Sequence, residues 1–154
     1  MTHEDLDAVS IQRICCGDPE AAQWLQVGRV YCHAIDDLID EDIPNSHRIR
    51  GAERVCVIGA LALEVYTHPF FIKHSAALKQ AMLTCTNTYA DSVRWEHSPV
   101  TWQMQYADWA RHAWIQVVLT VAGLCGGYTH MRALSEELWA ISYADHHNTA
   151  GAAT

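Results

Sequence analysis

Apolar side chains recur three or four residues apart along most of this chain, and that spacing decides what it can fold into. The clearest example is the stripe Leu78, Met82, Cys85, Tyr89 and Val93. Such a stripe occupies one face of an α-helix. No run of alternating β-branched residues between turn signals competes with it. The sequence therefore predicts an all-α protein.

Proline, glycine and capping residues divide the chain into separate helices. Asp18-Pro19-Glu20 and Ser98-Pro99 are typical helix starts, whereas Pro44, His68-Pro69 and Gly126-Gly127 are typical ends. Helices are expected over residues 4–16, 18–41, 51–67, 72–97, 98–127 and 130–147, with residues 45–50 as a polar connection. We expect five or six helices in an antiparallel bundle with short turns. The helix over residues 51–67 is so apolar that we expect it to be buried.

The length of 154 residues suits one domain with a sizeable core. We predict a single helical domain over residues 1–147 and a disordered tail over residues 148–154, which are small and polar. The net charge of -8 argues against a nucleic-acid or anionic-membrane partner. No apolar run reaches the length of a membrane span.

The cysteine pattern bears on where the protein works. The six cysteines are Cys15, Cys16, Cys32, Cys56, Cys85 and Cys125. They form no Cys-x-x-Cys pair and no regular framework, and the polar, acidic start of the chain does not resemble a secretory signal. We therefore expect buried free thiols and a reducing, cytoplasmic location.

The most unusual stretch runs from His33 to Asp42, where five carboxylates fall within seven residues near the expected end of a helix. His33, Asp36, Asp37 and Asp40 lie three or four residues apart and so share one side of that helix. Each acid there faces the negative end of the helix macrodipole, at a cost of about 0.3–1 kcal/mol. A divalent cation would offset that cost, and Mg²⁺ favours a few carboxylates together with waters and phosphates. A solvated acidic face is the other interpretation.

Residues 31–41 (YCHAIDDLIDE) also resemble the first aspartate-rich motif of the class I isoprenoid synthase superfamily, which includes squalene and phytoene synthases. The resemblance implies that Asp36, Asp37 and Asp40 bind Mg²⁺, and that the metal holds a prenyl diphosphate. It covers about a dozen residues well. The usual domain of that superfamily is far longer, so this chain would be a reduced relative or would build its site as a dimer.

The same superfamily carries a second metal motif on a facing helix. Thr88, Ser92 and Glu96 have the four-residue spacing of one version of that motif, with Thr where Asn is usual. Asp91 is the acid available for the other, aspartate-rich version. The second motif is therefore a partial match.

These observations lead to a first hypothesis of a Mg²⁺-dependent enzyme, with Mn²⁺ as the alternative metal, that acts on a diphosphate-containing small molecule. The predicted metal ligands are Asp36, Asp37, Asp40, Asp91 and Glu96. Arginine forks suit phosphate oxygens, and the predicted substrate-binding residues are Arg54, Arg94 and Arg111.

Three further residues are candidates for the chemistry. Asp108 and His112 are four residues apart on a polar line of the helix over residues 98–127, where they could share a metal or hydrogen-bond to each other. With His33 they form the predicted catalytic set, and they also allow a mixed His and carboxylate site for a transition metal.

Two other functions remain open. Asp37-x-x-Asp40 also matches the first acidic pair of the small all-α nucleotide pyrophosphohydrolases of the MazG kind. A non-enzymatic, acidic, protein-binding module is the second alternative, because Trp95, Trp102 and Trp109 gather around the Ser98-Pro99 turn and could anchor an interface. A homodimer would be compatible with each of these hypotheses.

Overall fold

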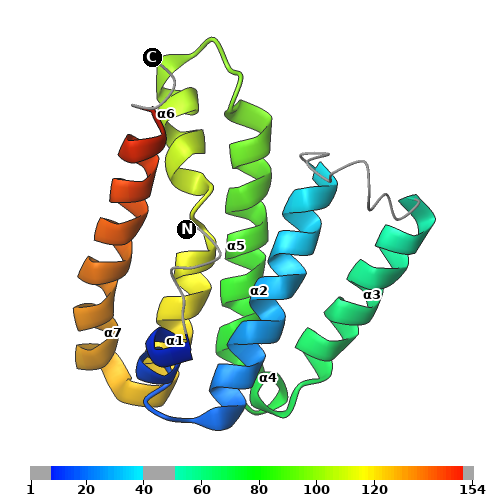
Figure 1. Cartoon of the computed structure of the whole chain (residues 1–154), viewed down its shortest axis with the longest axis vertical. Coiled ribbons are helices and arrows are strands. Elements are labelled where there is room, and N and C mark those ends of the chain that lie inside the picture. The colour runs from blue at the N-terminus through cyan, green and yellow to red at the C-terminus, as the bar shows by residue number, and fades with distance from the viewer. Residues whose placement is uncertain (1–7, 40–50, 151–154) are drawn as a thin grey trace. The chain divides into compact units, whose positions relative to one another are not determined.

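The computed structural model describes residues 8–39 and 51–150 (Figure 1). All regular structure in these ranges is helical, so the all-α prediction is confirmed. The seven helices are α1 (Ala8–Ile14), α2 (Pro19–Ile39), α3 (Gly51–Thr67), α4 (Pro69–Lys73), α5 (Ser75–Trp95), α6 (Thr101–Ala110) and α7 (Trp114–Ala150). Their contacts define two compact units: unit 1 contains α1, α5, α6 and α7, and unit 2 contains α2, α3 and α4. The single-domain boundaries therefore stay a prediction.

Unit 2 is a hairpin of α2 and α3, with the one-turn helix α4 packed against both. Its largest buried side chain is Trp24, which is 0% exposed and packs against Phe70 and Phe71 with ring centroids 6.0 and 6.1 Å apart. The Trp24 Nε1–H donates to the Val65 carbonyl at 3.0 Å. In a continuing helix that carbonyl would accept from residue 69, but Pro69 has no N–H. Trp24 therefore fills the core and satisfies the end of α3.

The end of α3 lies where the sequence predicted it. The His68 Nδ1 accepts a hydrogen bond from the Phe70 N–H at 3.2 Å, and Pro69 occupies the first position of α4. A histidine cap followed by proline closes one helix and opens the next, because proline cannot continue α3 but is preorganised for a first turn.

The expected burial of the α3 helix is wrong. Val55 and Leu63 are 64% and 67% exposed, and Tyr66 is also exposed. Val65, on the opposite face, is fully buried beside α2 and α4. The helix is apolar on all sides but contacts its neighbours in unit 2 through one side only, so composition overestimated its burial.

Unit 1 packs α5 against α6 and α7, and α1 against α7. The α5 stripe contributes the buried side chains Leu78, Met82 and Cys85, as predicted. The first half of α7 meets it with a run of buried β-branched and small residues, namely Ile115, Val117, Val118, Val121 and Ala122. The core of this unit is therefore built from one face of α5 and the nearly all-apolar start of α7.

The helix expected over residues 98–127 is interrupted, and this correction affects the site. Residues 111–113 form a turn between α6 and α7, with the His112 N–H donating to the Trp109 carbonyl at 3.2 Å. The expected boundary at Gly126-Gly127 is real, because Gly127 adopts φ 76° and ψ -177° and kinks α7. Glycine accepts this positive φ without the steric cost that other residues bear.

The exposure of the cysteines and the apolar character of the helices test two further predictions. Cys15 and Cys85 are buried, as predicted, but Cys16 and Cys56 are exposed, so the prediction of buried thiols is wrong for those two. Within the described ranges, no helix is both long enough and apolar enough to cross a membrane.

The Trp24–Val65 hydrogen bond makes the first testable prediction. Trp24→Phe keeps most of the ring packing but removes the donor, so the buried carbonyl loses its partner. We expect the free energy of unfolding to fall by about 1–3 kcal/mol, as measured by urea denaturation. Trp102→Phe is the matched control, because Trp102 is 59% exposed, and it should cost less than about 0.5 kcal/mol. Equal effects of the two substitutions would contradict the assignment.

Candidate functional site

The acidic turn, which we define as Asp36 and Asp37 of α2, lies in the last turn of its helix. Asp36 is half-buried and Asp37 is exposed. No basic residue occupies the last turn of α2 as far as Ile39, where the described helix ends. The two carboxylates therefore add negative charge at the negative end of the helix macrodipole. Asp40, the third acid of the predicted motif, lies outside the described residues.

The half-buried His33 stands one turn before the acidic turn on α2. Its spacing from Asp36 and Asp37 is the one that places side chains on a common side of a helix. The predicted association of these three residues is therefore retained by the continuous helix. All three belong to unit 2.

Arg54 is the predicted phosphate-binding residue that belongs to the same unit as the acidic turn. It lies in the first turns of α3 and is half-buried. Its Nε is shielded from solvent and has no hydrogen-bond partner among the described residues. A buried guanidinium nitrogen without a partner is costly, so this side chain has unused capacity to donate to an anion.

The remaining predicted ligands belong to unit 1. Asp91 is half-buried and Arg94 is exposed, both near the end of α5. Glu96 follows that helix directly, and its carboxylate accepts a hydrogen bond from the Arg111 guanidinium. Glu96 also lies 3.3 Å from the His97 Nε2. A predicted metal ligand and a predicted phosphate ligand thus pair with each other.

The second metal motif lies along α5 with mixed exposure. Thr88 is half-buried, and Ser92 is only 1% exposed. The Ser92 hydroxyl donates to the Tyr89 carbonyl at 2.7 Å. The face that carries Thr88, Ser92 and Glu96 thus turns partly into the core of unit 1.

Asp108 and His112 do not lie on one continuous helix. Asp108 is in α6, which ends at Ala110, and His112 is in the turn that follows. The i,i+4 geometry that the spacing predicted is therefore replaced by a tighter turn. Both residues are half-buried and remain candidates for a role at this end of unit 1.

The predicted metal ligands are divided between the two units: Asp36 and Asp37 in unit 2, and Asp91 and Glu96 in unit 1. Among the residues described, no three His, Cys, Asp or Glu side chains are arranged to hold a metal ion. The part of the acidic motif that the structure describes thus supplies two carboxylates on one helix turn.

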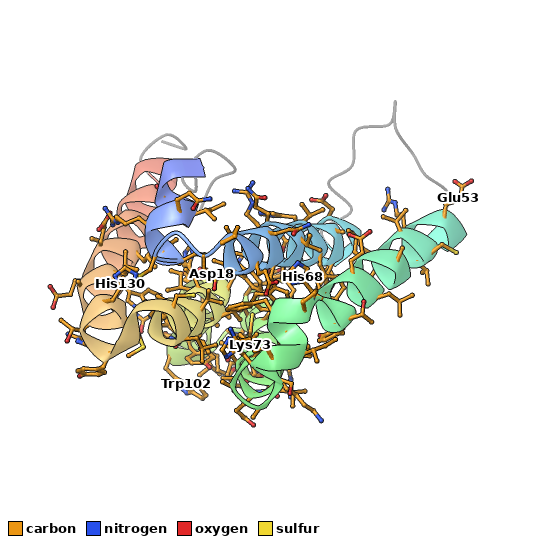
Figure 2. The ribbon with its side chains drawn as sticks, turned by 90° about the horizontal axis from the view of Figure 1, so that it is seen from below. Asp18, Glu53, His68, Lys73, Trp102 and His130 are labelled. Carbon is orange, nitrogen blue, oxygen red and sulfur yellow. The ribbon has the colours of Figure 1, made fainter. Side chains whose placement is uncertain are left out.

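An aromatic cluster in unit 1 is larger than the sequence indicated. The Trp95 ring contacts Trp102 and Tyr106 at centroid distances of 5.4 and 5.5 Å. Trp109 continues the series, with Tyr106 at 6.0 Å and Trp139 stacked at 5.2 Å with an interplanar angle of 9°. Trp102 and Trp109 are 59% and 49% exposed, and Figure 2 labels Trp102.

Part of this aromatic cluster could have been recognised from the sequence. Trp102, Tyr106 and Trp109 have the four-residue and three-residue steps of one helix face. Trp139 is thirty residues further along the chain and no local pattern connects it with Trp109. The stacking of these two rings is a tertiary contact between side chains of α6 and α7, which both pack against α5.

Comparisons with known proteins add no family to this description: no family model, curated protein or solved structure matches the chain.

The Glu96–Arg111 ion pair provides the second prediction. Because the Glu96 and Arg111 side chains are 23% and 51% exposed, solvent screens the pair. A double-mutant cycle of Glu96→Gln and Arg111→Gln should give a coupling of about 0.2–1 kcal/mol. The coupling, measured by urea unfolding, should shrink as salt is added. The exposed pair Arg132–Glu136 on α7 is the control and should couple no more strongly. A coupling of zero at low salt would contradict the ion pair.

Proposed function

We propose that the protein is a Mg²⁺-dependent enzyme that acts on a diphosphate-containing small molecule through the acidic turn of α2. The observation that carries the proposal is electrostatic. Asp36 and Asp37 crowd the negative end of a helix whose last turn holds no basic residue. A hard divalent cation would relieve this repulsion, and all of the donor atoms offered are carboxylate oxygens, which suit Mg²⁺. Asp40 completes the proposed ligand set.

The chemistry follows from the residues present. When bound, Mg²⁺ would neutralise charge on the phosphate oxygens and thereby stabilise a leaving diphosphate or orient an attacking water. Asp36 and Asp37 hold the ion in this proposal. His33, one turn earlier, accepts or donates a proton near the reacting group. Asp91 and Glu96, the other predicted ligands, belong to unit 1, where Glu96 already accepts from Arg111.

Arg54 is the favoured phosphate contact among the three predicted arginines. It belongs to the same unit as the acidic turn, and its Nε has no partner among the described residues. Arg111 already donates to Glu96, and Arg94 is exposed at the end of α5. A guanidinium with a free donor matches the fixed fork geometry that phosphate oxygens accept.

The third prediction tests the metal site directly. Titration calorimetry with Mg²⁺ in the presence of pyrophosphate should detect binding to the wild-type protein. Asp36→Asn and Asp37→Asn should each weaken Mg²⁺ binding at least about tenfold. Replacing a residue that only hydrogen-bonds to a metal ligand already lowers metal affinity about 10–100-fold, so loss of a ligand itself should cost no less. Glu64→Gln is the matched control: it removes one negative charge from the exposed face of α3 and should leave the affinity unchanged. Helicity measured by circular dichroism should be the same in all variants.

Affinity that is equal in wild type and in both aspartate variants would refute the metal site. The substrate class is decided by product analysis. Release of pyrophosphate from a nucleoside triphosphate would favour the pyrophosphohydrolase, whereas turnover of a prenyl diphosphate alone would favour the isoprenoid-type reaction.

The aromatic cluster favours a second candidate function, a non-enzymatic protein-binding module. Its exposed members are accompanied by the exposed Val100 and Met104 beside or within α6. Tryptophan and tyrosine are the residues most often found at the centre of binding interfaces. A second copy of the same chain is the partner to test first, because every copy presents the same rings and isologous contacts are self-complementary.

The fourth prediction addresses this candidate. If the cluster forms a self-interface, Trp102→Ala combined with Trp109→Ala should abolish a concentration-dependent dimer in sedimentation velocity. Leu63→Ala is the control, since Leu63 is an equally exposed apolar side chain in unit 2. A monomer at every concentration, or a dimer that survives loss of both rings, would exclude a self-interface at the cluster.

A further inference from the structure

The C-terminal end of α1 meets the kink of α7 within unit 1, and cysteine and histidine side chains gather at this meeting point. The His130 Nε2 lies 3.1 Å from the Ile14 carbonyl (Figure 2 labels His130). Since a carbonyl only accepts, Nε2 carries the proton of this hydrogen bond. Nδ1 is then the ring nitrogen of the neutral imidazole that can accept a proton.

Cys16 lies against the same part of α7. A Cβ on Gly126 would meet the Cys16 Sγ at 2.6 Å and the His130 Cδ2 at 2.5 Å. The thiol and the imidazole therefore flank one point beside the α7 backbone, and only glycine leaves room for both. Cys16 itself is exposed and has a φ of 51°, a left-handed conformation that is costly for a residue with a side chain.

Two more thiols, those of Cys15 and Cys125, lie near this junction of α1 and α7. The Cys15 thiol is fully buried. This burial, and to a lesser extent the nearby Cys125, raises the pKa of Cys15 to about 12. Cys16 contributes to the same shift, so both neighbouring thiols lie close to Cys15. Cys125 is half-buried and directly precedes Gly126, against which the Cys16 sulfur packs. An accessible thiol, a half-buried thiol and an inert thiol thus meet at one junction.

No three of these side chains are arranged to hold a metal ion, as is true of all the residues described. The arrangement suits reversible thiol oxidation instead. Redox-sensitive cysteines are accessible, lie near a group that promotes the thiolate, and have a second cysteine within reach to resolve the oxidised form.

We propose that Cys16 is a peroxide-sensitive thiol, and that its oxidised form is captured by Cys125 as a disulfide joining the end of α1 to α7. His130 accepts the Cys16 thiol proton. Cys15 takes no part, because a buried thiol does not supply the thiolate that such reactions need.

One molecule of hydrogen peroxide is consumed for each disulfide that forms. The Cys16 thiolate attacks one peroxide oxygen, the O–O bond breaks, and the departing hydroxide takes up the thiol proton as water, leaving a sulfenic acid. The Cys125 thiolate then attacks the sulfenic sulfur. The S–O bond breaks as the S–S bond forms, and the departing hydroxide takes up the proton that the Cys125 thiol released, so that it leaves as the second water. Two thiols lose two electrons in total, and peroxide is reduced to two waters.

The fifth prediction is tested by peptide mapping of the full chain. After treatment with hydrogen peroxide and alkylation of free thiols, a disulfide-linked peptide pair should contain Cys125 and the Cys15-Cys16 segment, and dithiothreitol should reverse the link. Cys56 is the internal control, because it is also exposed, and it should remain largely alkylated at the same peroxide dose.

Matched variants identify the cysteine that reacts. Cys16→Ala should abolish the link, whereas Cys15→Ala should retain it. Cys125→Ser should leave the Cys16 sulfenic acid to be trapped by dimedone. A link that survives Cys16→Ala, or equal oxidation of Cys16 and Cys56 in the wild-type protein, would overturn the proposal.

The role of His130 has its own readout. His130→Gln should remove the preference of peroxide for Cys16 over Cys56 and should flatten the dependence of the Cys16 oxidation rate on pH. The link itself should still form slowly, with helicity unchanged. An unaltered rate and pH profile would show that His130 only positions the backbone of α1.

Discussion

The hydrogen bond from the Trp24 indole to the Val65 carbonyl joins α2 to the end of α3, and it compensates for a donor that proline removes. Pro69 ends α3 cleanly but leaves the Val65 carbonyl without its helical donor. Trp24 supplies that donor from α2 and buries its ring against α4. One side chain therefore ties three helices together, and α2 is held in register with α3 as it runs on to the acidic turn.

Unit 1 depends on glycine where unit 2 depends on proline. Gly126 allows the Cys16 sulfur and the His130 ring to approach the α7 backbone, and Gly127 takes up the positive φ that redirects the helix. The His130–Ile14 hydrogen bond and the ion pair between Arg13 and Glu137 then connect α1 to the second half of α7. The junction combines the buried Ile14 and Cys15 with the accessible thiol of Cys16. That combination is what a reversible thiol site requires.

Some charged side chains of the chain form ion pairs, whereas the acidic turn has no basic residue on the same helix turn. Arg111 and Glu96 satisfy each other, and Arg13 and Glu137 do the same. The last turn of α2 has no basic residue of its own. Since the chain has an excess of acids, with a net charge of -8, clustered carboxylates such as Asp36 and Asp37 attract cations. The proposed function thus rests on where Asp36 and Asp37 lie, at the end of α2, rather than on the total number of acids. The aromatic cluster has a different basis, since its rings gain by leaving water and require no ion.

Local sequence alone determined the helices, most of their ends and the crowding of carboxylates on one turn of α2. Helical periodicity, caps, proline and glycine act within a few residues, so their effects can be read directly. Tertiary structure decided which charged side chains, aromatic rings and thiols contact one another. Glu96 meets Arg111 only because a turn returns the chain after α5, and Trp109 stacks on Trp139 only because α6 and α7 both pack against α5. The exposure of α3 and the meeting of Cys16 with Gly126 and His130 have the same origin. These contacts join residues far apart in the chain, and no local pattern specifies which apolar face will be covered or which charge will find its partner.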